Sequence, residues 1–158
     1  MRRTTLIAVG ILALLGVLAG SSAASGGSVR SERAALVIVQ RAPQVASLDF
    51  GAPGPSAGDV LVFRSDIYDR TNSTLLGDLN ITCTQTIGPE NLCRGIFRFT
   101  GQGALSVDAL PVFPNATVGI VNGGSGQFAR ARGDADIQPQ PDGTTIITFH
   151  LSPGGDED

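Results

Sequence analysis

Residues 121–133, VNGGSGQFARARG, decide the fold class of this chain. A β-branched apolar run at 117–121 precedes this stretch and alternating residues follow it, so we expect the chain to reverse between two strands. Glycine freely adopts positive φ, which a tight reversal requires. No helical pattern follows, which excludes a phosphate-binding loop, because such a loop must begin a helix. The structural glycines of this predicted corner are Gly123, Gly124, Gly126 and Gly133.

Short apolar or alternating segments, separated by turn residues, make up the rest of residues 34–152. A segment rich in Pro, Gly and Ala, 42–58, is expected to be a loop. The pattern contains no convincing helix and predicts an all-β fold, either a sandwich or a closed antiparallel barrel. The predicted strands are 34–40, 59–69, 75–86, 92–100, 104–108, 117–122, 127–137 and 144–151.

The two cysteines, Cys83 and Cys93, lie on consecutive predicted strands. An even pair in a secreted chain predicts a disulfide. A hairpin that turns at residues 88–89 would place Cys83 opposite Cys93 and Leu79 opposite Phe97, so that the apolar faces of both strands coincide. The alternative is a free catalytic thiol at Cys83. One His and two Cys give no metal site of the usual composition, so none is expected.

The first 24 residues have the pattern of a secretory signal peptide: two arginines, an apolar run at 6–19 and a small-residue end. The apolar run is too short for a membrane helix, which needs roughly 20 residues. We therefore expect a secreted, extracellular protein without stable membrane insertion. The predicted organisation is a signal peptide at 1–24, a flexible N-terminus at 25–33, a barrel domain at 34–152 and a solvated acidic tail at 153–158.

Composition excludes several partners. All 11 basic residues are Arg, so chemistry that needs a Lys Schiff base is excluded. Two of them lie in the predicted signal peptide, and the remaining nine against 14 acidic residues leave a net charge of −5. An acidic chain without a basic run is a poor candidate for nucleic acid, because neutralisation of phosphates dominates that affinity.

Two motifs in order resemble the barrel shared by allene oxide cyclases and dirigent proteins. The first is FRFTGQGALSV at 97–107, and the second is IVNGGSGQFARARG at 120–133. Residues 58–59, 76–77 and 148–151 also fit bacterial, secreted-type members. The resemblance covers 34–152 and implies an eight-stranded, calycin-type antiparallel β-barrel with an apolar cavity, commonly a homo-oligomer (dimer or trimer). Cyclases of this family steer a reactive fatty epoxide to one ring product, and dirigent proteins steer the coupling of phenoxy radicals.

The resemblance implies a cofactor-free secreted barrel that steers cyclisation or coupling of a small apolar intermediate in its cavity. Whether the protein is an enzyme, an isomerase of the cyclase kind, or a non-catalytic dirigent-type guide is left open. Two further alternatives are a barrel that only binds an apolar ligand and a structural cell-surface barrel filled by its own side chains. The ligand-binding or barrel-filling residues are predicted to be Phe63, Phe97, Phe99 and Phe128.

The candidate catalytic residues lie on the strand at 59–69. Family members often carry a carboxylate that faces the cavity from the corresponding strand, and Asp66 is the nearest candidate. An inward carboxyl in an apolar barrel would have a raised pKa and could donate a proton. Arg64 and Tyr68 share its face and complete a predicted polar cluster. The alternative is that all three residues lie on an outer, solvated face.

Overall fold

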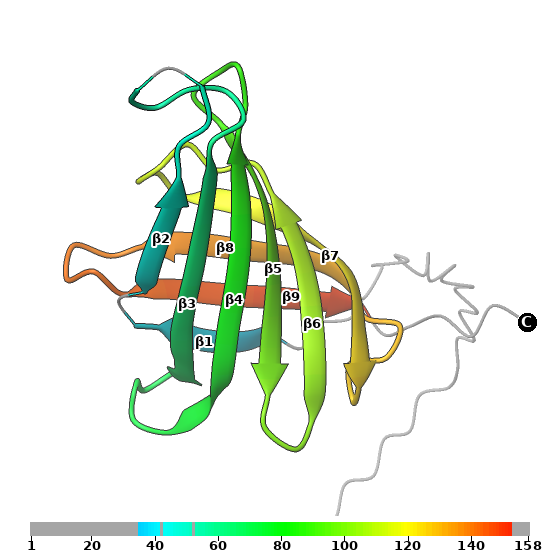
Figure 1. Cartoon of the computed structure of the whole chain (residues 1–158). Helices are drawn as coiled ribbons and strands as arrows, with labels where there is room; N and C mark the ends of the chain where they lie inside the picture. The colour runs from blue at the N-terminus through cyan, green and yellow to red at the C-terminus, as the bar shows by residue number, and fades with distance from the viewer. Residues whose placement is uncertain (1–34, 42, 52, 153–158) are drawn as a thin grey trace, which may run out of the picture. The chain divides into compact units, whose positions relative to one another are not determined.

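The computed structural model describes residues 35–41, 43–51 and 53–152, and within these ranges the chain forms nine strands and no helix (Figure 1). The predicted signal peptide, N-terminal segment and acidic tail lie outside the described residues. The described part therefore contains no helix that could cross a membrane. The strands are β1 (Ala35–Gln40), β2 (Gln44–Leu48), β3 (Val60–Asp69), β4 (Leu75–Gln85), β5 (Asn91–Phe99), β6 (Gly103–Ala109), β7 (Thr117–Gly126), β8 (Arg132–Pro139) and β9 (Thr145–Ser152).

The strands close into an antiparallel barrel. Their order is β1-β9-β8-β7-β6-β5-β4-β3-β2, and β1 also pairs with β3. Residues 38–40 of β1 pair with residues 67–69 of β3, and β2 then pairs with residues 60–64 of the same strand. β1 and β2 thus act as one barrel strand interrupted at residues 41–43. The predicted eight-stranded antiparallel barrel is confirmed.

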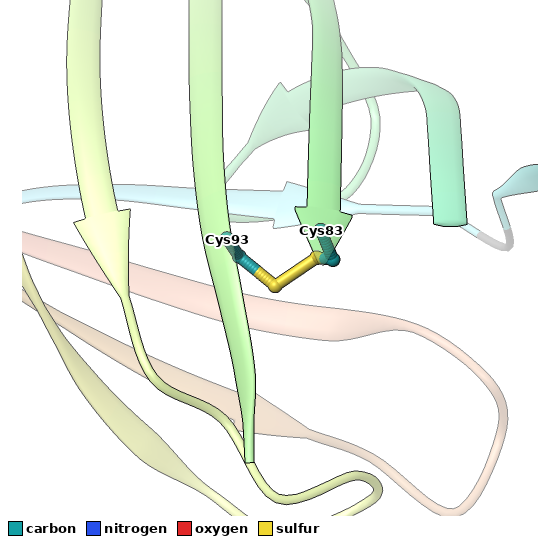
Figure 2. Close-up of a disulfide and its surroundings, with 2 residues drawn as sticks. All are labelled: Cys83 and Cys93. Atoms are coloured by element: carbon teal, nitrogen blue, oxygen red, sulfur yellow. A yellow bond between two sulfur atoms is a disulfide. The ribbon is translucent and has the colours of Figure 1, made fainter. Parts of the chain in front are cut away.

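The disulfide and the register of its hairpin are also confirmed. Cys83 at the end of β4 is bonded to Cys93 near the start of β5, and the two residues are directly opposed (Figure 2). Leu79 lies opposite Phe97, as the apolar pattern requires. The disulfide is compatible with an extracellular protein, as predicted from the first 24 residues.

Three predicted boundaries are wrong. The segment 42–58 contains β2, a strand that its composition disguised. β7 does not end before the glycines but continues to Gly126, paired with β6 across a bulge. The chain reverses only at residues 127–131, so β8 begins at Arg132 and not at Gln127. Glycine is needed at Gly126 for a positive φ of 60°, and at Gly133 because φ is 140° and a Cβ would collide with the carbonyl oxygen of His150.

Alternating side chains fill the inside of the barrel. On β5 every odd-numbered residue from Asn91 to Phe99 is buried and every even-numbered residue is exposed. The inner face carries two aromatic pairs. Phe97 packs edge-on against Phe149 with ring centroids 5.1 Å apart, and Phe99 packs against Phe128 at 4.9 Å. These rings fill the interior towards the end of β5, and they leave the opposite end, where β5 begins, to the cavity described next.

Candidate functional site

A cavity of about 240 Å³ occupies the barrel end that the disulfide marks. It lies where β4, β6 and β8 end and where β5, β7 and β9 begin, as can be followed in Figure 1. The segment 110–116, between β6 and β7, runs along this end and contains a cis peptide bond between Phe113 and Pro114. Phe113 lines the cavity and is still half exposed, so the cavity reaches the surface beside this ring.

The wall of the cavity is almost entirely apolar. Phe63 of β3 and Phe113 form a tilted aromatic pair with ring centroids 5.8 Å apart. Both sulfurs of the disulfide belong to buried residues on the wall. None of the described residues that line the cavity has an ionisable side chain. The further apolar residues on the wall are Pro43, Ile81, Ala109, Pro111, Pro114, Ile137 and Pro139.

Four polar side chains interrupt this apolar wall. Asn115 is exposed on the connection before β7 and Thr117 begins β7, whereas Gln40 and Thr145 lie opposite each other on β1 and β9. Gln40 at the end of β1 shares its strand face with Ile38, which is fully buried in the core, and only 7% of Gln40 is exposed. Its register partner on β9 is Thr145, which lines the cavity with it. Among the described residues, neither side chain has a hydrogen-bond partner. The amide atoms of Gln40 are not among the fully enclosed polar atoms of the described residues, so the amide is accessible from the cavity and can bond whatever occupies it.

Two fully enclosed polar atoms without a partner belong to residues that follow or precede the cavity wall along their strands. Ser65 is two residues from Phe63 on the inner face of β3, and Asn91 is two residues from Cys93 on the inner face of β5. The Ser65 Oγ and the Asn91 Oδ1 are both fully enclosed and accept or donate no hydrogen bond within the described structure. Native proteins leave few such atoms.

A carboxylate organises the loop 49–59 beside this end of the barrel. Asp59 accepts hydrogen bonds from the backbone N–H groups of Phe50 and Ser56, at 2.8 and 2.7 Å. These bonds favour the charged form and lower the pKa of Asp59 below its ordinary value. The loop continues from β2, whose five residues are all exposed.

The predicted catalytic cluster lies on the outer face of β3. Arg64 and Asp66 are exposed and alternate with the inward residues Ser65 and Ile67. Tyr68 shares the outer face, where the Arg41 guanidinium stacks on its ring at 3.5 Å from the centroid. Of the two alternatives left by the sequence, the outer placement is therefore observed. A catalytic role for Arg64, Asp66 and Tyr68 stays a prediction, and none of the three lines the cavity.

The four predicted phenylalanines divide between the two ends of the barrel. Phe63 lines the cavity. Phe97 and Phe99 are buried in the packed core, and Phe128 packs against it. The barrel is thus filled by its own side chains at one end and hollow at the other. Ligand contact is available to Phe63, and for the other three it stays a prediction. Three further residues of the cavity wall, Gln40, Thr145 and Phe113, were not predicted from the sequence.

Charged and apolar residues share the outer face of β5, β6 and β7. Arg94 and Asp108 form a bidentate pair at 2.8 and 3.0 Å, and this pair lowers the pKa of Asp108. Val118 and Ile120, on β7, are 60% and 64% exposed beside it. An exposed apolar sheet face is a feature of interfaces, and the predicted homo-oligomer stays a prediction. A second charged pair lies on the neighbouring strands β8 and β9, where His150 Nε2 and Asp136 Oδ2 form a hydrogen bond at 2.9 Å.

No protein-family model and no curated protein sequence matches this chain, so membership of the allene oxide cyclase and dirigent family stays a prediction.

Solved structures do resemble it. A pyocyanin demethylase superposes with a TM-score of 0.68 at 20% identity and covers 75% of this chain and 100% of its own. The Diels–Alderase AbmU from Streptomyces koyangensis has a TM-score of 0.58 at 16% identity, over 80% of this chain and 72% of its own. A nonspecific heme-binding cyclase that catalyses a 4 + 2 cycloaddition in neoabyssomicin biosynthesis has a TM-score of 0.56 at 16% identity, over 78% and 70%. At these identities the likeness shows a shared barrel fold.

Proposed function

We propose that this chain is a secreted barrel that binds a small, neutral, apolar molecule in its end cavity and steers the cyclisation of that molecule. The observation that supports this most strongly is the cavity itself. A barrel that served only as a scaffold would fill both ends with side chains, as the aromatic pairs Phe97–Phe149 and Phe99–Phe128 fill one. Barrel cyclases among the structural neighbours support the same assignment.

Confinement is the mechanism that suits this wall. No ionisable side chain lines the described cavity, so acid–base catalysis by a residue of the wall has no candidate there. A reactive intermediate that already has a low barrier needs only to be held in one conformer, and the walls then decide which product forms. The rigid lining, with Phe63 and the disulfide on one side and proline residues on the other, suits this task.

The volume favours cyclisation of one molecule over coupling of two. An engineered apolar cavity of about 150 Å³ binds benzene, with six non-hydrogen atoms. On the same scale, 240 Å³ holds about ten non-hydrogen atoms. The enclosed part of the cavity thus holds one folded chain of this size but not two phenoxy radicals together, and any further part of a ligand would extend past Phe113 to the surface. The cyclase reading is therefore preferred to the dirigent reading.

The first test is native mass spectrometry of the protein secreted by its own host, followed by denaturing extraction of any bound small molecule. We expect an apolar molecule with the wild type. Ala109→Leu, which fills the cavity from β6, should lose it, and Ala104→Leu on the outer face of the same strand should keep it. An empty wild-type protein that also retains nothing from a host metabolite extract would contradict the proposal and favour a structural barrel.

Steering is tested with an achiral decatrienone whose diene and enone close into a bicyclic ketone without a catalyst. The closure is an isomerisation, so no oxidant or co-reactant is needed. Buffer gives a racemic product, and we expect an enantiomeric excess with the wild type and none with Ala109→Leu. Binding without any excess would favour the alternative, a non-catalytic carrier. Asp66→Asn should behave as the wild type, and a lost excess would restore the predicted role of Asp66.

A further inference from the structure

We infer that Gln40, with Thr145 beside it, is the polar anchor that orients a neutral ligand with one carbonyl oxygen in the cavity. This inference rests on the proposed function and names the class of ligand that the cavity would take. It assigns specificity to a pair of residues on β1 and β9, on the wall away from the disulfide.

The placement of Gln40 follows from the register. On β1 it shares the inner face with Ile38, and across the sheet it is opposed by Thr145 on one side and Ile67 on the other. β1 stops here, and the chain leaves the barrel wall at residues 41–43 before β2 resumes the pairing with β3. Gln40 is thus the last residue of β1 before this interruption. It is only 7% exposed, and it lines the cavity.

The donors of the pair determine the ligand. A glutamine amide offers two N–H donors and one carbonyl acceptor, and a threonine hydroxyl offers one more donor. Directly opposed residues of an antiparallel pair have Cβ atoms about 4.5–5.5 Å apart, close enough for both donors to reach one oxygen. A ketone or aldehyde oxygen accepts two hydrogen bonds, so it satisfies Gln40 Nε2 and Thr145 Oγ1 together.

The rest of the wall sets the remaining limits. It carries no cation for a carboxylate or phosphate, and burying an unpaired anion is strongly unfavourable. Most of its other contacts are apolar, from residues such as Phe63, Ile81 and Ile137. The remaining polar side chains, Asn115 and Thr117, lie on or beside the connection between β6 and β7. The ligand is therefore a neutral carbonyl compound with an otherwise mainly apolar body, and the enclosed volume holds about ten of its non-hydrogen atoms.

Two probes that differ only by the carbonyl test the anchor: tetralin and α-tetralone. Dissociation constants are measured by titration calorimetry for the wild type, Gln40→Leu, Thr145→Val and the outer-face control Gln138→Leu. The quantity of interest is the preference for tetralone over tetralin in the wild type, divided by that in each variant, because this ratio cancels the cost of desolvating the ketone. One hydrogen bond to a neutral group corresponds to about a 3- to 10-fold ratio.

We expect a ratio in this range for Gln40→Leu and a smaller ratio for Thr145→Val. Gln138→Leu should leave the preference unchanged, and all variants should still bind tetralin. A tetralin carboxylate should not bind. The side-chain amide signals of Gln40 should shift with tetralone and not with tetralin in the wild-type protein, which tests the contact even if Gln40→Leu does not fold. Tetralin and tetralone binding with no dependence on Gln40 would overturn the anchor and leave the cavity proposal standing. Binding of neither probe by the wild type would count against both.

Discussion

Removing the Cys83–Cys93 cross-link tests whether the cavity end of the barrel depends on it. The disulfide closes a loop with a sequence separation of 10. In the chain-entropy model, a loop of that size lowers the entropy of the unfolded chain by about 9 cal/mol/K, which is about 2.7 kcal/mol at 25 °C. Reducing the bond keeps both sulfur atoms in the protein and requires them only to separate to van der Waals distance, so the difference between oxidised and reduced wild type comes mainly from the cross-link.

Urea unfolding followed by far-UV circular dichroism measures that difference, since the chain has no Trp and one Tyr. We expect the reduced protein to lose about 2–3 kcal/mol of unfolding free energy and to unfold with a somewhat larger denaturant slope, because its unfolded chain exposes more surface. The double variant Cys83→Ala/Cys93→Ala should lose more than the reduced protein, since it also removes two sulfurs from the cavity wall.

A loss below about 1 kcal/mol on reduction would refute the reasoning. It would mean that the hairpin of β4 and β5 already restricts the unfolded chain, so that the cross-link removes little entropy. An equal loss for the reduced protein and the double alanine variant would show that the sulfurs contribute no packing.

Three further predictions concern stability. Gly133→Ala should lower the unfolding free energy by about 2–5 kcal/mol, because its Cβ meets the His150 carbonyl oxygen at a strained φ, whereas Gly143→Ala, at positive φ in open space, should lose about 1–2 kcal/mol; urea unfolding checks both. Ala109→Leu should raise the melting temperature of the ligand-free protein while abolishing tetralin binding, and a lower melting temperature would indicate an over-packed wall. Asp69 has a pKa lowered to about 2 by backbone hydrogen bonds, so its contribution to stability is present above about pH 4 and is lost as the pH falls towards 2; Asp69→Asn should flatten that part of the profile, and an unchanged profile would contradict this.

Most of the barrel was predictable because alternation is a local signal. On β5 a single run of residues shows which face is inner, and the opposed pairs Cys83–Cys93 and Leu79–Phe97 then fix the register of β4. β2 gave no such signal, because all five of its residues are exposed and none is required to be apolar. The end of β7 was misplaced because glycines that favour a turn also tolerate the close strand contacts found there.

The orientation of the candidate catalytic cluster was within reach of the sequence. Leu61, Phe63 and Ile67 share one face of β3, and the more apolar face is the inner one. Asp66 belongs to the opposite face, although the resemblance to a family with an inward carboxylate favoured it. The prediction that Asp66 faces the cavity gave more weight to its residue type than to the alternation along β3. The observed orientation of Asp66 follows the alternation.

The cavity and its anchor were beyond local signals. A hollow depends on the summed volumes of side chains from every strand, so no single segment reports it. Gln40 is the last residue of an apolar strand, and a polar residue at that position ordinarily indicates that the chain enters a solvent-exposed loop. Only closure of the barrel, which pairs β1 with both β9 and β3, turns that strand end into a buried wall position.

The residue type at position 40 is itself an argument for function. Gln40 is only 7% exposed and no hydrogen bond joins its side chain to another described residue. A leucine of similar volume would suit the apolar wall around it, whereas the amide presents its donors and its acceptor to the cavity. The other end of the same barrel shows that the fold fills its interior with aromatic rings where nothing else is required. A hollow that keeps an amide and a hydroxyl side by side is therefore better explained by what enters it than by what holds the barrel together.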